Sequence, residues 1–331
     1  MNEFSYTRPA TLDEALVLLE PQVGESDARS LLAGGTDLLT LIKGSILAPR
    51  QLIDIKRLLE LERDITVTDG GLRIGALATL AQLQADPRVQ ESFSALAQAA
   101  GLAASPQLRH MATIGGNLLQ QPRCWYFRDE QVSCWRKGGD SCPAADPQGE
   151  NQHHALFGDG PCYAVHPSDP AAALLAFSAQ VRVRDRQGER SIPLEEFYTV
   201  PTDGHRQEHQ LPPGSLITAI ELPSGSTAAR SVYLKAMDRR AWAFALVGVA
   251  AQVTVQGGLI STATLVLNGV APIPWRVPAA EAELVGKAPG PEVFTAAAEV
   301  ALQDARPLAK NGYKIELAKG LIERALAATT S

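Results

Sequence analysis

Hydrophobic and polar positions divide the 331-residue chain into three stretches with different patterns. The first, residues 1–57, predicts a βαβαβ order with strands around 4–6, 28–33 and 51–55. One helix is expected from Thr11, where Glu14 takes the capping-box position, and another from Thr36 or Asp37. This stretch therefore predicts a small α/β unit.

The second stretch, residues 58–224, predicts hairpins and helices. Residues 65–76 alternate around Asp69-Gly70-Gly71, and residues 181–194 alternate in the same way, so both predict β-hairpins. The helices are expected at 79–85, 91–104 and 169–179, and a last strand at 216–222. Between Leu119 and Ser168, about 45 irregular residues are rich in Gly, Pro and Asp.

The third stretch follows a turn-rich linker at 223–229. Three β-rich runs, 231–237, 244–255 and 260–270, predict an antiparallel meander, and helical patterns follow at 291–305 and 312–328. The whole pattern predicts an α+β protein. We expect two α/β subdomains at 1–57 and 58–224 and a C-terminal domain of antiparallel sheet and helices at 225–331.

Charge and hydropathy exclude several classes of protein. The formal net charge is −6 and Lys and Arg form no basic stripe, which disfavours nucleic-acid binding. The N-terminus lacks the basic and apolar regions of a signal peptide, and no apolar run is long enough to cross a bilayer. We therefore expect a soluble protein without membrane insertion, cytoplasmic by its sequence.

Two Thr-bearing double-glycine motifs are candidates for binding a diphosphate. Leu32–Asp37 lies between a strand and a helix, where glycine backbone and free N–H groups favour an anion. Ala112–Leu118 could supply donors from the other side. Each motif could equally be a simple turn. Two such motifs together are stronger evidence for a diphosphate site than either motif alone. No G-x-G-x-x-G or P-loop motif is present.

All four cysteines fall within 39 residues, a concentration that predicts sulfur ligation. Zinc sites usually contain C-x(2–4)-C pairs, which are missing, whereas an iron–sulfur cubane suits wide, irregular spacing. A disulfide pair, unligated thiols and zinc stay open as alternatives. His153 and His154 lie in the same region, where a solvent-facing loop is the default interpretation.

The order AGGTDLL, ATIGGNLL and HPSDPAAALLAFSA, followed by the antiparallel and helical tail, resembles a known family over essentially the whole chain. It is similar to the FAD-binding medium subunits of the molybdenum hydroxylases, the xanthine dehydrogenase, aldehyde oxidoreductase and carbon monoxide dehydrogenase group. The resemblance implies an FAD-binding fold of the vanillyl-alcohol-oxidase/PCMH type. The implied FAD contacts are Ser30, Leu31, Leu32, Ala33, Gly34, Gly35, Thr36, Asp37, Leu38, Thr113, Gly116 and Asn117, with Asp169 and Lys235 as further contacts.

Most members of this family run almost directly from the GGN motif into the P-x-D helix, so residues 120–167 are an insertion here. The insertion resembles the branch with an extra [4Fe–4S] cluster, found in the medium subunits of periplasmic aldehyde oxidoreductase and 4-hydroxybenzoyl-CoA reductase. The phrases RCWYF, CYAVHPSD and DRRAWAFALVGVAA look closest to the aldehyde oxidoreductase type. The implied cluster ligands are Cys124, Cys134, Cys142 and Cys162.

The resemblance also implies the partners. A molybdopterin-containing large subunit would oxidise an aldehyde or heterocycle, and a small subunit with two [2Fe–2S] clusters would pass electrons to FAD here and on to an external acceptor. A partner carrying a twin-Arg signal could export the complex to the periplasm. Two other hypotheses are a self-sufficient flavin oxidase with a zinc-stapled loop and a non-catalytic zinc-binding scaffold.

Overall fold

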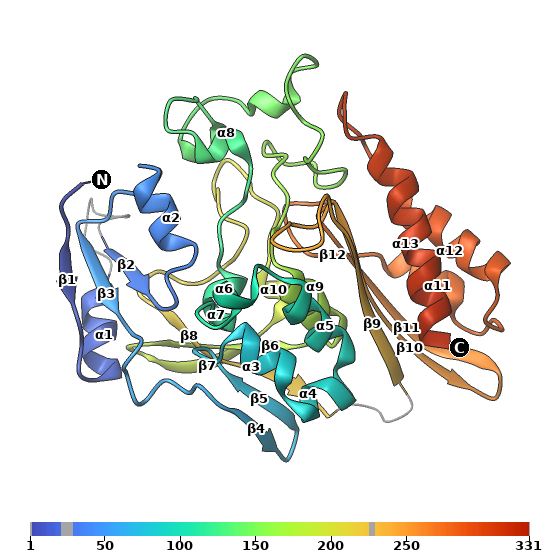
Figure 1. Cartoon of the computed structure of the whole chain (residues 1–331), viewed down its shortest axis with the longest axis horizontal. Helices are drawn as coiled ribbons and strands as arrows, with labels where there is room; N and C mark the ends of the chain where they lie inside the picture. Colours follow the sequence, from blue (N-terminus) through green and yellow to red (C-terminus); the bar gives the residue numbers. More distant parts are fainter. Residues whose placement is uncertain (1, 21–28, 225–228, 331) are drawn as a thin grey trace.

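The structure, a computed structural model, describes residues 2–20, 29–224 and 229–330. In this part of the chain the strands form a three-stranded, a five-stranded and a four-stranded sheet. In Figure 1 these sheets follow one another from left to right in chain order, with the cysteine-bearing insertion above them. The predicted linker at 223–229 falls largely on residues 225–228, outside the described residues.

The N-terminal unit has the expected βαβαβ order. Its sheet is parallel, with strand order β1-β3-β2. Thr11 caps the first helix by accepting a hydrogen bond from the backbone N–H of Glu14, while the Glu14 carboxylate accepts from Ala10 rather than from Thr11. The elements are β1 (Ser5–Thr7), α1 (Leu12–Leu19), β2 (Arg29–Leu32), α2 (Leu38–Lys43) and β3 (Gln51–Asp54).

The middle sheet is antiparallel throughout, and both expected hairpins are confirmed within it. Its strand order is β4-β5-β8-β6-β7. The strands are β4 (Ile65–Thr68), β5 (Gly71–Gly75), β6 (Gln180–Asp185), β7 (Gly188–Pro193) and β8 (Leu216–Pro223). The connecting helices are α3 (Leu80–Ala85), α4 (Pro87–Ser92), α5 (Ser94–Leu102), α6 (Pro106–Arg109), α7 (Ile114–Leu118), α9 (Asp169–Ala176) and α10 (Leu194–Phe197).

The helix expected at 91–104 begins later, as α5 at Ser94, and its first two residues end a separate helix, α4; the two helices are divided at Phe93. This residue has a non-helical backbone, and its buried ring packs edge-on against Phe177 with centroids 5.1 Å apart. Burial of the Phe93 ring therefore overrides the continuous helical pattern. Asp86 starts the first of the two helices by accepting from the backbone N–H groups of Arg88 and Val89.

The C-terminal domain is the expected meander, extended by one short strand. Gly257 and Gly258 both have positive φ, +60° and +81°, which is the backbone of a tight hairpin turn between β10 and β11. The strands are β9 (Ala229–Ala236), β10 (Val247–Gln256), β11 (Leu259–Asn268) and β12 (Trp275–Arg276). The helices are α11 (Pro278–Leu284), α12 (Pro291–Leu302) and α13 (Tyr313–Thr330).

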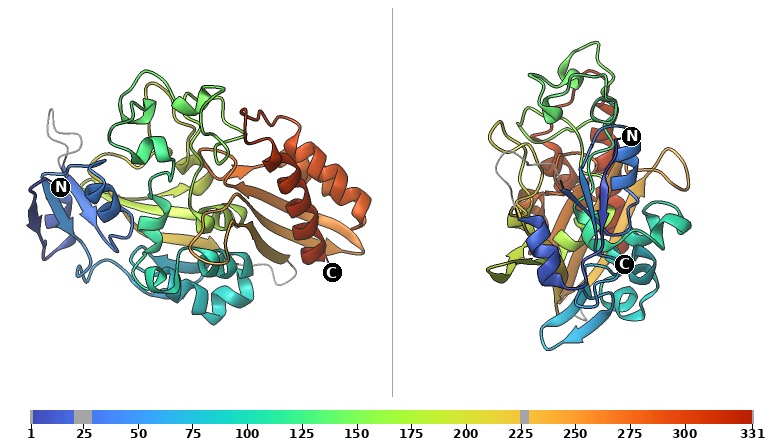
Figure 2. Two further views of the ribbon diagram at one scale, coloured as in Figure 1. Left: turned by 45° about the horizontal axis from the view of Figure 1, so that its top comes forward. Right: turned by 90° about the vertical axis from the view of Figure 1, so that its left-hand side faces the viewer.

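This last sheet is covered on both faces. The three C-terminal helices pack on one face, as Figures 1 and 2 show, and the middle-domain helices α5 and α9 contact the strands on the other. Strand β10 is correspondingly apolar along most of its length, with Val249, Ala250 and Ala251 fully buried in succession. The sheet thus joins the C-terminal domain firmly to the middle one.

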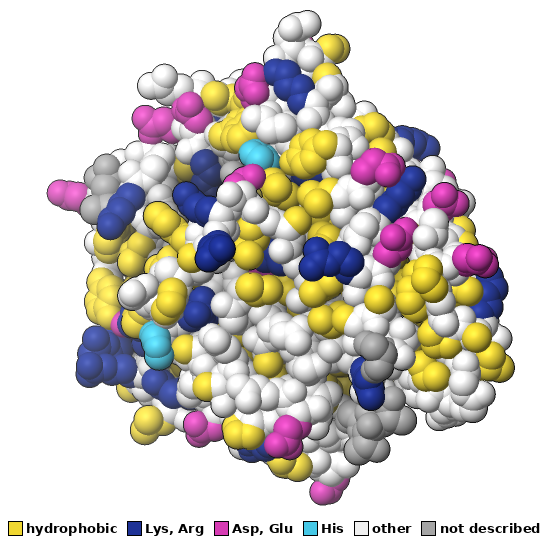
Figure 3. All heavy atoms as spheres, turned by 45° about the vertical axis from the view of Figure 1, so that its right-hand side comes forward, with side chains coloured by type: hydrophobic (Ala, Val, Ile, Leu, Met, Phe, Trp, Pro, Cys, Tyr) yellow, Lys and Arg dark blue, Asp and Glu magenta, His cyan; other side chains and the backbone are white. Residues whose placement is uncertain are grey.

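The insertion contains little regular structure, only α8 (Trp125–Arg128) and two 3-10 turns, η1 (Trp135–Lys137) and η2 (Pro143–Ala145). It projects beyond the sheets in Figures 1 and 2. On the face drawn in Figure 3, Lys and Arg side chains surround hydrophobic ones near the centre, and acidic side chains lie mostly nearer the edge. Charges of both signs are thus present on this face.

Candidate functional site

The two double-glycine motifs lie against each other. A Cβ atom added to Gly34 would be 1.9 Å from the carbonyl oxygen of Met111 and 3.3 Å from the Cα of Ala112. Only glycine allows the two backbones to approach this closely. Gly35 has φ +71°, which turns the chain from β2 toward α2. The two motifs therefore form one continuous wall.

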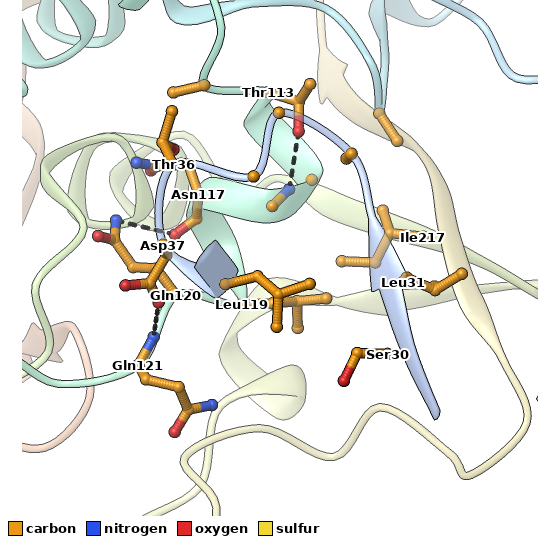
Figure 4. A pocket seen from close by; sticks show the side chains of 18 of the residues that line it. Ser30, Leu31, Thr36, Asp37, Thr113, Asn117, Leu119, Gln120, Gln121 and Ile217 are labelled. Atoms are coloured by element: carbon orange, nitrogen blue, oxygen red, sulfur yellow. Dashed lines mark hydrogen bonds between the residues drawn. The ribbon is translucent and has the colours of Figure 1, made fainter. Parts of the chain in front are cut away.

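A cavity of about 290 Å³, called the smaller cavity below, opens beside this wall. Figure 4 shows polar side chains, among them Thr36, Asn117 and Gln120, on one side and the apolar Leu31 and Ile217 on the other. Most of the expected FAD contacts line it: Ser30, Leu31, Ala33, Gly34, Gly35, Thr36, Asp37, Leu38, Thr113, Gly116 and Asn117. Leu32 does not; it is buried in the core.

The second motif begins a short helix rather than a turn. The hydroxyl oxygen of Thr113 accepts from the backbone N–H of Gly116 at 3.3 Å and so caps α7. Asn117 accepts from the Ser168 hydroxyl, the N-cap of α9, which ties the motif to the P-x-D helix. Both side chains at this edge of the smaller cavity are thereby held in one orientation, as Figure 4 shows for Thr113.

A second cavity of about 740 Å³, called the larger cavity, adjoins the first. Aromatic side chains of Trp125, Trp242 and Phe244 contribute to its wall. The residues that line both cavities are Thr36, Ala112, Asn117, Gln120 and Arg123. A single elongated ligand could therefore fill both spaces across this shared wall.

Asp169 lines the larger cavity, but Lys235 lies behind it. The fully buried Lys235 ammonium is 2.7 Å from the Asp169 carboxylate, which also accepts from the Tyr233 hydroxyl at 2.6 Å and from Asn268 at 3.1 Å. Burial beside this carboxylate raises the pKa of Tyr233 well above its ordinary value, so its hydroxyl stays a donor. The network holds Asp169, the first residue of α9, against strands β9 and β11 of the C-terminal sheet.

Asp37 connects the first motif to the insertion. Although it occupies the N-cap position of α2, its side chain makes no capping hydrogen bond. Its carboxylate instead accepts from the backbone N–H of Gln121 at 2.8 Å and lies 2.7 Å from the guanidinium groups of both Arg123 and Arg128. The insertion is thus bound to the very strand–helix turn that lines the smaller cavity.

The four cysteines lie near one another, and none forms a disulfide. Cys124 packs with Cys134 in one hydrophobic cluster and with Cys162 in another, and Cys142 is close enough to Cys124 and Cys162 to oppose their ionisation. Burial raises the pKa of Cys124 to about 11 and that of Cys162 to about 12. The bare thiols of Cys124 and Cys162 are therefore protonated at neutral pH, and a metal would have to displace their protons.

The surroundings of the sulfurs fit thiolate ligands. Backbone N–H groups of Tyr126 and Phe127 stabilise the ionised form of Cys124, and the N–H group of Tyr163 does the same for Cys142. Hydrogen bonds of this kind are typical around iron–sulfur ligands. Among the described residues, no three His, Cys, Asp or Glu side chains are close enough together to share one metal ion.

The solvent-facing interpretation of the histidine pair is wrong for His154. This side chain is buried, and its Nε2 lies 3.3 Å from the Cys124 sulfur. Burial lowers the pKa of His154 to about 4, so its ring is neutral at pH 7. His153 is exposed as expected. His154 also lines the larger cavity and therefore lies between that cavity and the cysteines.

Sequence reasoning missed two charged residues at the site. Arg123 lines both cavities, and burial lowers its pKa to about 10, which leaves it charged at neutral pH. Lys314 is fully buried, and its ammonium donates to the backbone oxygens of His153, His154 and Gly269 at 2.8–3.0 Å. No local motif marks Arg123, whereas Lys314 occupies the buried stripe of α13 with Ala318, Leu321 and Ala325.

Comparison with known proteins covers nearly the whole chain. Residues 2–225 match the family described as the FAD binding domain in molybdopterin dehydrogenase, and residues 232–329 match the CO dehydrogenase flavoprotein C-terminal domain. The chain is 39% identical over 331 residues to the aldehyde oxidoreductase FAD-binding subunit PaoB of Escherichia coli (strain K12). That alignment covers 99% of this chain and 98% of the relative.

More distant relatives agree. The carbon monoxide dehydrogenase medium chain of Hydrogenophaga pseudoflava is 29% identical over 327 residues, which cover 98% of this chain and 96% of that one. A solved structure of carbon monoxide dehydrogenase from the same organism aligns with a TM-score of 0.76 at 28% identity, over 99% of this chain and 97% of that chain. The expected mixture of helices and sheets with a C-terminal antiparallel sheet is thereby confirmed.

Within the described residues, no helix has the length and apolar character needed to cross a membrane. The family matches span both parts of the chain, and the two glycine motifs that carried the resemblance meet at one wall. The chain therefore belongs to the FAD-binding medium subunits of the molybdenum hydroxylases and is a subunit of an oxidoreductase.

Proposed function

We propose that this subunit holds FAD across the two cavities and passes electrons from iron–sulfur centres of a partner subunit to an external acceptor. The observation that carries the proposal is the shared wall, where both glycine motifs border two adjoining cavities of about 290 and 740 Å³. FAD has the matching shape, because its diphosphate joins a nucleoside to a larger ring system.

The lining of each cavity supports one orientation of the cofactor. The apolar Leu31, Leu77 and Ile217 of the smaller cavity suit the adenine end, and the aromatic wall of the larger cavity suits the isoalloxazine. The diphosphate then falls at the shared wall, near the backbone N–H groups of the first glycine motif, because the N–H groups of residues 114–117 in the second motif already donate within the protein. FAD, when bound, couples one-electron carriers to a two-electron acceptor.

We further propose that Cys124, Cys134, Cys142 and Cys162 hold a [4Fe–4S] cluster. A cubane places one thiolate on each of four separate irons, whereas zinc needs its ligands around one ion. The supporting observations are that the four sulfurs are neighbours and that backbone N–H groups face the sulfurs of Cys124 and Cys142. Cys124 also lines the larger cavity, so this cluster would lie beside the flavin end of FAD.

Anaerobic purification of the full chain and an absorption spectrum test both cofactors. We expect flavin bands over a broad shoulder that dithionite bleaches, one FAD and four irons per chain. Cys134→Ser should lower the iron content and retain most FAD, while Ser133→Ala at the neighbouring exposed position should change neither. Zinc in place of iron would refute the cluster, and a colourless, flavin-free protein would refute the proposed function.

The 39% identical relative is an aldehyde oxidoreductase subunit, which supports an aldehyde as the substrate of the complex. We propose a large molybdopterin subunit and a small subunit with two [2Fe–2S] clusters as partners. Co-expression and affinity purification of this chain should recover both, with aldehyde-dependent reduction of an artificial acceptor by the complex only. Turnover of aldehyde by this chain alone would contradict the division of labour. Fractionation of cells distinguishes a cytoplasmic complex from an exported one.

A further inference from the structure

Arg123 belongs to the insertion and lines both cavities of the proposed FAD site, as Gln120 does. Arg123 directly precedes Cys124 and stands at the shared wall of the cavities with Thr36 and Asn117. Most of the insertion lies away from this wall. The position of Arg123 therefore requires an explanation in terms of the cavities as well as the cysteines.

The charges around Arg123 are unbalanced. The single carboxylate of Asp37 lies 2.7 Å from Arg123 and 2.7 Å from Arg128, so two guanidinium groups share one negative charge. The larger cavity is also lined by Asp169, which is already paired with the buried Lys235, and by Asp238, which is exposed and is not among the charges that act on Arg123. One positive charge is therefore left over where the two cavities meet.

The guanidinium of Arg123 is also held in place. Its Nη1 donates to the backbone oxygen of Gln121 at 2.6 Å, its Nη2 donates to Gln120 at 3.1 Å, and it lies over the ring of Phe244 at 4.8 Å. Only about a quarter of its side chain is exposed. A fixed, partly buried guanidinium with excess positive charge is suited to a phosphate group.

We infer that Arg123 binds the diphosphate of FAD from the side of the insertion, opposite the two glycine motifs. This inference rests on the proposed function, that FAD spans both cavities. The first glycine motif supplies uncharged N–H donors, and Arg123 supplies the charge that offsets the diphosphate. The insertion thus contributes to the flavin site through Arg123 and to the cysteine site through the next residue, Cys124.

Binding of two ligands to the full-length chain tests the inference. The ligands are FAD and riboflavin, which carries the same ring without phosphate, each titrated against FAD-depleted protein by fluorescence. Arg123→Met should raise the Kd for FAD roughly ten- to a hundredfold, the loss of one charge-assisted hydrogen bond, and leave the Kd for riboflavin unchanged. Arg123→Lys should give an intermediate value, because charge stays while the planar fork is lost.

Arg240→Met is the matched control. It removes the same charge from an exposed position in the loop that borders the larger cavity, but Arg240 lines neither cavity. Its Kd for FAD should equal that of the wild type. Equal FAD binding by Arg123→Met and wild type, or equal losses of FAD and riboflavin, would overturn the role of Arg123. If Arg123→Met does not fold, a wild-type Kd in Arg123→Lys and Arg123→Gln would overturn it as well.

The titrations distinguish a failure of the Arg123 assignment from a failure of the proposed function. A wild-type chain that binds neither FAD nor riboflavin would refute FAD binding across the cavities, whatever the variants do. A wild-type chain that binds FAD while Arg123→Met binds it equally well would refute only the assignment of Arg123.

Discussion

Replacement of Gly34 by Ala should separate the two glycine motifs and release FAD. The added Cβ would lie 1.9 Å from the carbonyl oxygen and 2.8 Å from the carbonyl carbon of Met111. Ordinary contact between carbon and oxygen begins at roughly 3.4 Å, so one backbone must move by more than about 1 Å. A rotamer change cannot relieve the clash, because the atoms it meets belong to the main chain.

The size of the effect on stability and on FAD affinity follows from how far the Gly34→Ala substitution displaces the backbone at the shared wall. Overpacking of this kind costs about 1–3 kcal/mol of folding stability. A shift of about 1 Å is also enough to break hydrogen bonds from the motif to a diphosphate, each worth about 1.5–3 kcal/mol when the acceptor is charged. Loss of two such bonds weakens FAD binding by roughly two to four orders of magnitude.

Two measurements check this expectation: FAD titration by fluorescence and thermal unfolding of the flavin-free chain. Gly70→Ala is the control, because a Cβ there meets no atom within 4 Å. We expect the control to bind FAD like the wild type and Gly34→Ala to lose FAD while its fold is retained. Wild-type affinity in Gly34→Ala would show that the close approach of Gly34 to Met111 is unrelated to cofactor binding.

Three further predictions concern buried ionisable groups. Lys314→Met removes the ammonium donor from the backbone carbonyls of His153 and Gly269, while the His154 carbonyl keeps Asn311 as a donor. The change should lower the free energy of unfolding by about 3 kcal/mol, against little change for the more exposed Lys319→Met. Asp169→Asn leaves the Lys235 ammonium buried without a counter-charge, and thermal unfolding should report a loss of about 3–5 kcal/mol; an unchanged melting temperature would contradict the pairing. Burial lowers the pKa of His166 to about 3, so its contribution to stability is complete above pH 6.5 and is lost as the pH falls toward 3. Urea unfolding should therefore show that the free energy of unfolding falls, between pH 7 and pH 5, by about 2 kcal/mol more in the wild type than in His166→Asn.

Periodic hydrophobic positions predicted most of the long elements, because each presents one face to a core. The βαβαβ unit, both hairpins, the meander and the last two helices follow this rule. The helices that were missed, α4, α6, α7, α8, α10 and α11, have four to seven residues. Two turns or fewer cannot show a helical period, and α7 even contains two glycines, which disfavour a helix.

The glycine motifs of the site could be predicted because their chemistry is local to a few residues. Arg123 could not be predicted, because its role at the site depends on Asp37, which lies far away in the sequence and is brought near by folding. Lys314 did carry a signal that was overlooked: it falls in the apolar stripe of its helix with Ala318 and Leu321. A charged residue in such a stripe indicates buried hydrogen-bond partners.

The cysteine insertion is held by protein contacts at three points along its length: its beginning, its middle and its last part. Asp37 binds its beginning, and a buried ion pair between Arg136 and Glu208 joins its middle to the loop before β8. Asn311 and Lys314 hold its last part by donating to the His154 carbonyl oxygen. Small metal domains that fold only around their ion lack such support. A cluster that merely braced this segment would duplicate contacts already present, so the position of Cys124 in the wall of the larger cavity favours an electron-transfer role for the proposed cluster.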